Sequence, residues 1–110
     1  THATALRRLG LVVETFENER YEQVLENIDR LGRLLDARPA AATRIAEIRG
    51  LRRAVERATR GRARPRTAIV IDRSPLYLVG GDTFLDELLA AVGAENLGAR
   101  LARGYPAGSL

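Results

Sequence analysis

Several residue types are missing from this 110-residue chain, and each absence excludes a class of chemistry. Cysteine, methionine, tryptophan and lysine are absent, and His2 is the single histidine. Without cysteine the chain has no disulfide, no cysteine-ligated zinc site and no thiol catalysis. With one histidine, neither a histidine metal cluster nor a Ser–His–Asp triad can be built from these residues alone. We therefore expect no enzyme activity, no resident metal and no cofactor.

Long apolar runs are also missing. No stretch approaches the roughly 20 apolar residues that span a bilayer, and the N-terminus lacks a signal-peptide pattern. Hydrophobic residues make up 45% and charged residues 29% of the chain, which is ordinary for a folded domain. The missing initiator methionine and the turn-like end at 108–110 predict a fragment of a longer protein. A processed or truncated small domain is the alternative.

All 18 basic residues are arginine, and the formal net charge is only +4. An arginine-rich helical module that binds nucleic acid or acts as a regulatory interaction module is therefore the alternative function. The arginine run contains no interleaved aromatic residues and matches no nucleic-acid-binding motif. Arg49, Arg53, Arg57 and Arg60 instead follow helical spacing. We read them as one solvated helix face and expect no nucleic-acid partner.

The first sixty residues predict a short helix–strand unit and then two long helices. Residues 1–19 contain a helix over Ala3–Leu9 and a short buried strand over Leu11–Val13, in which an unbroken apolar run fits a parallel sheet. Residues 20–60 contain helices over Tyr21–Leu35 and Ala40–Arg60, each with an apolar stripe at helical spacing. Pro39 fits the first turn of the second helix.

The last third predicts a strand that runs into a glycine turn and a capped helix. Residues 61–66 form a basic, proline-containing linker, and residues 67–110 begin a second α/β unit. Thr67–Asp72 is predicted as a buried strand and Leu76–Val79 as a shorter one. Thr83, with Asp86 three positions later, predicts a capping box at the start of a helix. In open α/β sheets such a junction is where ligands bind.

Four residues near this junction are the candidate ligand-binding residues. Gly80 and Gly81 allow the backbone to approach a ligand closely, and amide groups at a helix start can hold an anion. The turn is not a P-loop, because no lysine follows it. Tyr77 precedes the turn, and Tyr105 stands in a later loop. An aromatic ring on a loop offers a large rigid contact surface with a polar tip.

The order and spacing of these residues resemble the middle of a class III periplasmic substrate-binding protein. Leu6–Val13 resembles the last helix-to-strand unit of the N-terminal lobe, and Tyr21–Leu35 resembles the helix that follows. Ala40–Arg60 resembles the long helix that joins the lobes, and Pro65–Leu110 resembles the opening of the C-terminal lobe. The most specific marks are Pro75-Leu76-Tyr77 with Gly80, the helix Thr83–Leu89, Glu95-Asn96-Leu97, and Gly104-Tyr105-Pro106 with Ser109.

The resemblance implies an α/β fold in which central long helices join pieces of two parallel-sheet lobes. The implied function is the substrate-binding component of an ABC importer for cobalamin or a related ferric siderophore or haem ligand. Tyr77 and Tyr105 would then line the cleft between the lobes and pack against the ligand. The implied partner is an ABC permease, and the implied location is periplasmic or extracytoplasmic, with a lipid anchor in the full-length protein left open.

The chain departs from the family pattern in ways that limit ligand binding. Tyr105 stands where related chains often have tryptophan, and the chain ends before the glutamate that docks on the permease. Because half of the cleft is missing, we expect weak or no ligand binding by this fragment. The apolar helix faces that lose their partners predict a homodimer of the fragment.

Overall fold

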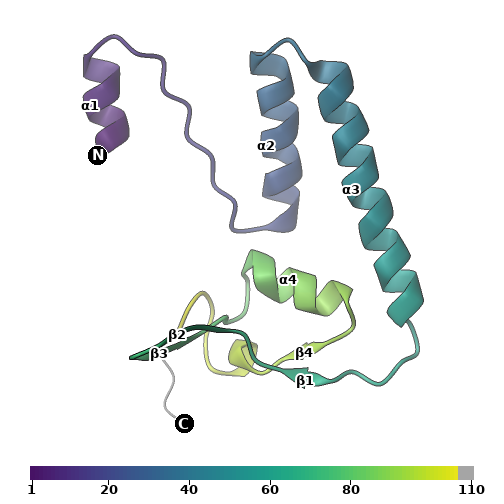
Figure 1. Cartoon of the computed structure of the whole chain (residues 1–110). Helices are drawn as coiled ribbons and strands as arrows, with labels where there is room; N and C mark the ends of the chain where they lie inside the picture. Colours follow the sequence, from purple (N-terminus) through teal and green to yellow (C-terminus); the bar gives the residue numbers. More distant parts are fainter. Residues whose placement is uncertain (107–110) are drawn as a thin grey trace.

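The computed structural model describes residues 1–106. Residues 107–110, which include the family mark at Ser109, lie outside the described residues. Two helices stand side by side, and a small mixed unit of strands and one helix lies beneath them (Figure 1). The elements are α1 (His2–Arg8), α2 (Tyr21–Leu34), α3 (Arg38–Thr59), β1 (Arg66–Thr67), β2 (Val70–Arg73), β3 (Leu76–Leu78), α4 (Phe84–Ala91), β4 (Glu95–Asn96) and the 3₁₀ turn η1 (Gly98–Arg100).

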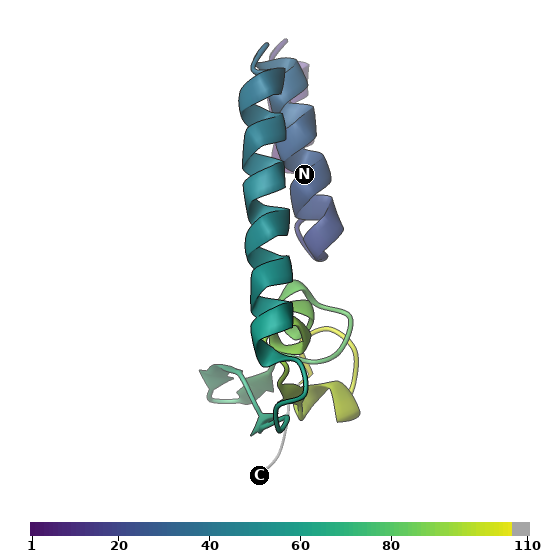
Figure 2. The ribbon, with the colours of Figure 1, turned by 90° about the vertical axis from the view of Figure 1, so that its right-hand side faces the viewer.

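The antiparallel pair α2 and α3 is the main helical unit, and both predicted long helices are confirmed to within two residues at each end. Figure 1 and Figure 2 show α2 beside the upper part of α3, whose lower end extends past α2 towards α4. Gly32 of α2 lies against Ala41 of α3, and Leu25 of α2 is buried. Other members of the predicted apolar stripes are exposed, so the stripes are covered only in part; they include Leu31, Leu35, Leu51 and Val55. Pro39 lies in the first turn of α3, as predicted.

The predicted strand over Leu11–Val13 is not formed. These residues belong to an extended segment that leads from α1 to α2 (Figure 1), and Val12 is 91% exposed. A strand needs a neighbouring strand to receive its backbone hydrogen bonds. No strand among residues 1–106 lies alongside this segment, so its apolar side chains have neither a sheet nor a core to join.

The predicted strand over Thr67–Asp72 is divided between two small sheets. The carbonyl of Thr67 accepts a hydrogen bond from the amide of Leu97 at 2.8 Å, whereas the carbonyl of Ile69 accepts from Val79 at 3.0 Å. β1 therefore pairs in parallel with β4, and β2 pairs antiparallel with β3. All four residues of β2 are exposed, which corrects the prediction of a buried strand.

A carboxylate of α4 links the helical pair to the mixed unit. Glu87 on α4 accepts hydrogen bonds from the backbone N–H of Tyr21 at 2.6 Å and from the guanidinium of Arg20 at 2.7 Å. Burial by itself would raise the pKa of Glu87, but these two donors outweigh it and lower the pKa below its ordinary value. The N-terminus of α2 thus rests on the first turns of α4.

Candidate ligand-binding wall

The turn between β3 and α4 is held by side chains of the helix that it starts. The hydroxyl of Thr83 accepts a hydrogen bond from the amide of Asp86 at 3.1 Å and donates one to the carbonyl of Gly80 at 3.2 Å. The Asp86 carboxylate accepts from the amide of Asp82 at 3.2 Å. Thr83 is therefore the predicted N-cap, while the reciprocal bond of the capping box goes to Asp82 instead of Thr83.

A second segment, residues 102–106, is bound along this turn by backbone hydrogen bonds. The amide of Gly80 donates to the carbonyl of Gly104 at 2.7 Å, and the amide of Gly81 donates to the carbonyl of Ala102 at 2.9 Å. The amide of Leu78 donates to the carbonyl of Pro106 at 3.1 Å. The amides of Gly80 and Gly81 are thus occupied by the chain itself, which corrects the expectation that they are available to an anion.

Gly80 is required by this close approach of the two segments. A Cβ atom built at position 80 would lie 2.7 Å from the carbonyl oxygen of Gly104 and 2.9 Å from the Cδ atom of Pro106. Real Cβ atoms do not come so near to backbone atoms without displacing them. Glycine here allows a backbone approach, as the sequence suggested, and the approaching group is the loop that carries Tyr105.

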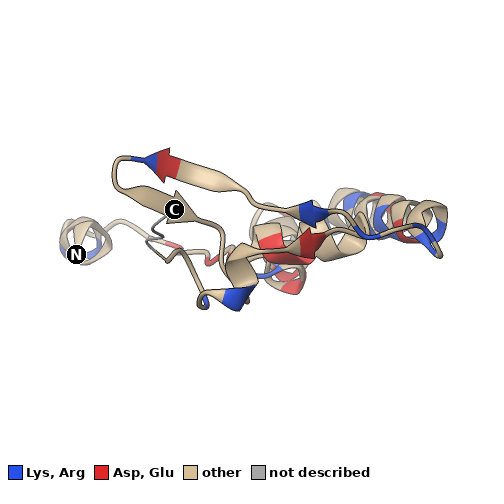
Figure 3. Ribbon diagram, turned by 90° about the horizontal axis from the view of Figure 1, so that it is seen from below, with Lys and Arg blue, Asp and Glu red and all other residues tan. Residues whose placement is uncertain are grey.

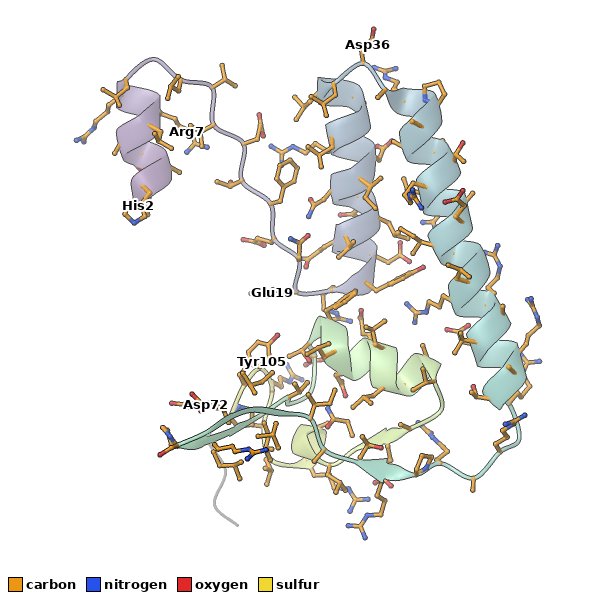
Figure 4. The ribbon with its side chains drawn as sticks, in the orientation of Figure 1. His2, Arg7, Glu19, Asp36, Asp72 and Tyr105 are labelled. Atoms are coloured by element: carbon orange, nitrogen blue, oxygen red, sulfur yellow. The ribbon has the colours of Figure 1, made fainter. Side chains whose placement is uncertain are left out.

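Tyr77 and Tyr105 stand on these two joined segments, and both are accessible. Their exposed fractions are 37% and 55%. Leu78 and Pro106, which follow the two tyrosines in the sequence, share a backbone hydrogen bond. Figure 4 shows Tyr105 beside the start of α4. We call residues 76–81 and 102–106, with their two tyrosines, the tyrosine wall.

A shallow hollow of about 130 Å³ opens next to one end of the tyrosine wall. Tyr105 lines this hollow and Tyr77 does not, so the structure brings the two rings onto neighbouring segments but not into one pocket. Typical small-molecule pockets measure about 300–1,000 Å³. The hollow can therefore hold only an edge of a large ligand. Its remaining lining residues are Glu19, Asp82, Thr83 and Gly104.

The charges around the hollow do not favour an anion. Glu19 and Asp82 both contribute carboxylates to its lining. Asp82 has a φ of 58° and pairs with Arg103 at 2.9 Å, an exposed ion pair that adds one more link between the turn and the 102–106 segment. A phosphate placed here would meet like charge and two amides that are already bonded.

Metal and nucleophile chemistry has little support within residues 1–106. No three histidine, cysteine, aspartate or glutamate side chains converge as a metal site in this part of the chain. His2 is exposed in α1 at the N-terminus. None of the described helices combines the length and apolar character needed to cross a membrane.

The arginines of α3 outnumber its glutamates, and part of this positive charge is paired with carboxylates. Figure 3, seen from below, shows both blue and red segments on the helices at its right-hand side. Ion pairs join Arg44 to Glu47 at 2.9 Å and Arg52 to Glu56 at 2.8 Å. Such pairing reduces the positive potential that a phosphate backbone would require.

Sequence reasoning missed two residues that organise the region around the tyrosine wall. The sequence placed Glu87 only within the helix that starts at Thr83. No local signal indicates that its carboxylate accepts from the first amide of a helix 66 positions away. Asn96 was noticed as part of the Glu95-Asn96-Leu97 mark. Its side chain is buried and reaches the turn between β3 and α4. The only signal in the sequence was a polar asparagine next to the apolar Leu97, which is compatible with a buried polar side chain.

No protein-family model matches the chain, and no curated protein sequence matches it significantly. Solved structures do match. A possible iron-binding (periplasmic solute-binding) protein from Staphylococcus epidermidis ATCC 12228 aligns with a TM-score of 0.81 at 18% identity, covering 96% of this chain and 42% of that one. S. aureus IsdE complexed with heme aligns with a TM-score of 0.76 at 14% identity, covering 91% of this chain and 40% of that one.

The periplasmic vitamin B12 binding protein BtuF of Vibrio cholerae aligns with a TM-score of 0.71 at 18% identity, covering 99% of this chain and 43% of that one. The chain thus spans about two-fifths of the length of the solved structures that it matches. Long helices, a parallel strand pair and these alignments together confirm the predicted α/β class. The chain has the fold of the corresponding part of these solute-binding proteins.

Proposed function

We propose that this chain belongs to the substrate-binding component of an ABC importer, and that the ligand is cobalamin or a related haem or ferric-siderophore compound. The kind of function is supported by the fold, because the structural neighbours are binding proteins whose names include iron, heme and vitamin B12. The tyrosine wall is the observation that carries the ligand class.

Two exposed tyrosines on hydrogen-bonded segments suit a large, flat, partly apolar ligand. Each ring of Tyr77 and Tyr105 offers a rigid apolar face with a polar tip, at a low entropy cost on binding. The occupied amides of Gly80 and Gly81 give the wall rigidity, so these glycines act in the site by shaping it. Recognition then rests on stacking and shape and does not need a charged anchor.

The long helix α3 supports a binding mode with little closure. Its 22 residues extend for about 33 Å without a break. A continuous helix between two lobes resists large hinge motion, so the proposed cleft is largely formed before the ligand arrives. The tyrosine wall contributes one side of that cleft.

Titration with three probes tests the proposal: cyanocobalamin, haem and a ferric hydroxamate siderophore. The 110-residue chain and any longer polypeptide that contains it are measured by absorbance and calorimetry. We expect the longer polypeptide to bind one probe with a Kd below about 10 μM, which is about −6.8 kcal/mol. The 110-residue chain should bind the same probe more weakly. If the longer polypeptide binds none of the three at this level, the ligand assignment is wrong.

The remaining partners follow from the same proposal. An importer component of this kind works outside the cytoplasmic membrane and delivers its ligand to a permease, and a lipid anchor would keep it there. Co-purification of the longer polypeptide with a tagged permease from the same genome tests this step. Recovery of the permease supports the pairing, whether or not the probe must be bound. If the permease is recovered neither with nor without the probe, the pairing is contradicted.

We also propose that the isolated chain pairs with a second copy through an apolar groove. The chain exposes 8192 Å², whereas a folded monomer of its 12.1 kDa exposes about 6,000 Å². Each chain therefore exposes about 2,000 Å² more surface than a compact monomer. Stable homodimers bury about 2,000–5,000 Å² in total, and the additional surface of two chains falls in that range. The groove lies between α3 and α4 and measures about 300 Å³. It is lined by Tyr21, Ile48, Leu51, Val55, Leu88 and Val92.

A further inference from the structure

The side chain of Asn96 lies beneath the turn that joins β3 to α4, and it is 8% exposed. Its amide nitrogen is 3.1 Å from the carbonyl oxygen of Val79, 3.3 Å from that of Gly80 and 2.9 Å from the carboxylate of Asp86. Two amide hydrogens are thus shared among three acceptors. Its amide oxygen accepts from the backbone N–H of Gly98 at 3.0 Å. Every polar atom of this buried side chain has a partner.

These bonds close a ring of side chains around the turn. Asn96 binds the carbonyl of Gly80 from below, and Thr83 binds the same carbonyl from the helix start. Asp86 connects the two, because it accepts from Asn96 with one oxygen and from the amide of Asp82 with the other, while its own amide donates to Thr83. The position of Gly80 is therefore determined from two sides.

The same turn also determines where the 102–106 segment lies. The amide of Gly80 donates to the carbonyl of Gly104, and Gly104 is the residue before Tyr105. A Cβ atom at Gly98 would overlap the carbonyl of Val79, so the 3₁₀ turn after Asn96 is also packed against β3 without space to shift. Loss of the Asn96 amide frees the carbonyls of Val79 and Gly80, and it also removes the bonds to Asp86 and Gly98.

We infer that Asn96 is the positioning residue of the tyrosine wall: its buried amide holds the Val79–Gly80 backbone against which the Tyr105 loop is bonded. Asn96 does not line the hollow, and none of its side-chain hydrogen bonds goes to Tyr77 or Tyr105. This inference rests on the proposed function for its biological meaning, while the geometry it asserts can be measured without any ligand. Loss of the amide should leave the helical pair intact and misplace the tyrosine wall.

The test uses a fluorescent reporter in the wall. The chain has no tryptophan, so Tyr105→Trp introduces a single one whose emission and acrylamide quenching report the environment of this loop. In that background Asn96→Leu keeps the branched shape and the number of heavy atoms of the side chain and removes all of its hydrogen bonds. We expect emission at longer wavelength and stronger quenching, with the far-UV circular dichroism of α2 and α3 unchanged.

Asn27→Leu in the same background is the matched control. Its side-chain amide also makes two hydrogen bonds, to the carbonyl of Glu17 at 2.6 Å and to Asn18 at 2.9 Å, but it lies on α2 away from the wall. This variant should leave the emission of the reporter as it was. Equal changes in the Asn96 and Asn27 variants, or no change in either, would overturn the inference.

Asn96→Asp provides a second test of the amide if the leucine variant fails to fold. An ionised carboxylate can still accept from Gly98 but cannot donate, and it faces two carbonyl oxygens and Asp86. We expect a displaced reporter at pH 8 and partial recovery near pH 5, where protonation restores one donor, with the asparagine parent unchanged over this range. An aspartate variant that matches the parent at both pH values would contradict the role of the amide.

Ligand binding separates this inference from the proposed function. In a longer polypeptide that binds haem or cyanocobalamin, Asn96→Leu should weaken the Kd by roughly tenfold, because the wall must be reordered on binding. If no probe binds the parent protein, the proposed function fails while the reporter result still decides the role of Asn96. If the probe binds the leucine variant as tightly as the parent, the positioning role is wrong.

Discussion

The carboxylate of Glu87 accepts a hydrogen bond from the backbone N–H of Tyr21 at 2.6 Å, across 66 positions of the chain. The first amides of a helix have no partner within the helix. α2 thus obtains its N-terminal acceptor from α4, and the negative charge also stabilises the positive end of the helix dipole. This contact determines how the helical pair stands on the unit that carries the tyrosine wall.

Replacing Glu87 with alanine should lower the free energy of unfolding by about 1–3 kcal/mol, since a partly buried N–H loses its acceptor. Urea denaturation followed by circular dichroism at pH 7 measures this change. Glu47→Ala is the matched control. Its carboxylate is about half exposed and pairs only with Arg44 along the surface of α3, so we expect a change of about 0.5 kcal/mol or less. Equal losses in both variants would contradict the special position of Glu87.

Stability should depend on pH through the same carboxylate. The pKa of Glu87 is lower in the folded chain than its ordinary value of 4.5, so its contribution is complete above 4.5 and is lost as the pH falls through the folded-state pKa. Glu87→Gln should therefore show a shallower loss of stability between about pH 5 and about pH 3 than the parent chain. Parallel stability curves for the two proteins would exclude Glu87 as a source of the acid sensitivity.

Gly80→Ala should disturb the tyrosine wall, whereas Gly50→Ala should not. A methyl group at position 80 meets the backbone of Ala102 and Gly104, and we expect a loss of about 1–3 kcal/mol in stability. A Cβ atom at Gly50 in α3 meets nothing within 4 Å, and alanine there should stabilise the helix by about 0.5–1 kcal/mol. Thermal unfolding of both variants compares the two effects. A stabilising Gly80→Ala would show that the two segments can separate at no cost.

Truncating either tyrosine should weaken binding of the probe that the longer polypeptide recognises. Tyr77→Ala and Tyr105→Ala should each cost about 1–2 kcal/mol of affinity, while the corresponding phenylalanine variants retain most of it, because the ring face makes the contact. Leu35→Ala is the control, since this residue is 72% exposed at the far end of α2. Unchanged affinity in both alanine variants would remove the rings from the binding site.

A charge placed in the groove between α3 and α4 should prevent pairing of two copies. Leu51 is 70% exposed on the groove side of α3, and Leu51→Glu should convert a dimer to a monomer in multi-angle light scattering. Leu35→Glu adds the same charge outside the groove and should leave the dimer intact. A parent chain that is monomeric at all accessible concentrations contradicts the pairing.

The sequence by itself determined the helices and their beginnings. Apolar spacing placed α2, α3 and α4 to within about two residues, because helical hydrogen bonds and caps such as Thr83 are local. It also indicated that Gly80 permits a close backbone approach and that Tyr77 precedes the glycine turn, whereas the common location of Tyr77 and Tyr105 was implied by the family resemblance alone.

Only the tertiary structure decided which backbone groups meet across the chain. Within residues 1–106 the strand predicted at Leu11–Val13 has no partner. The strand predicted over Thr67–Asp72 changes partner at Ile69, because pairing depends on which segments the fold brings alongside, as when Thr67 pairs with Asn96. For the same reason the sequence did not reveal that the 102–106 segment occupies the glycine amides, or that Glu87 and Asn96 act at distant turns. Each of these contacts exists only once the folded chain brings the two groups to hydrogen-bonding distance.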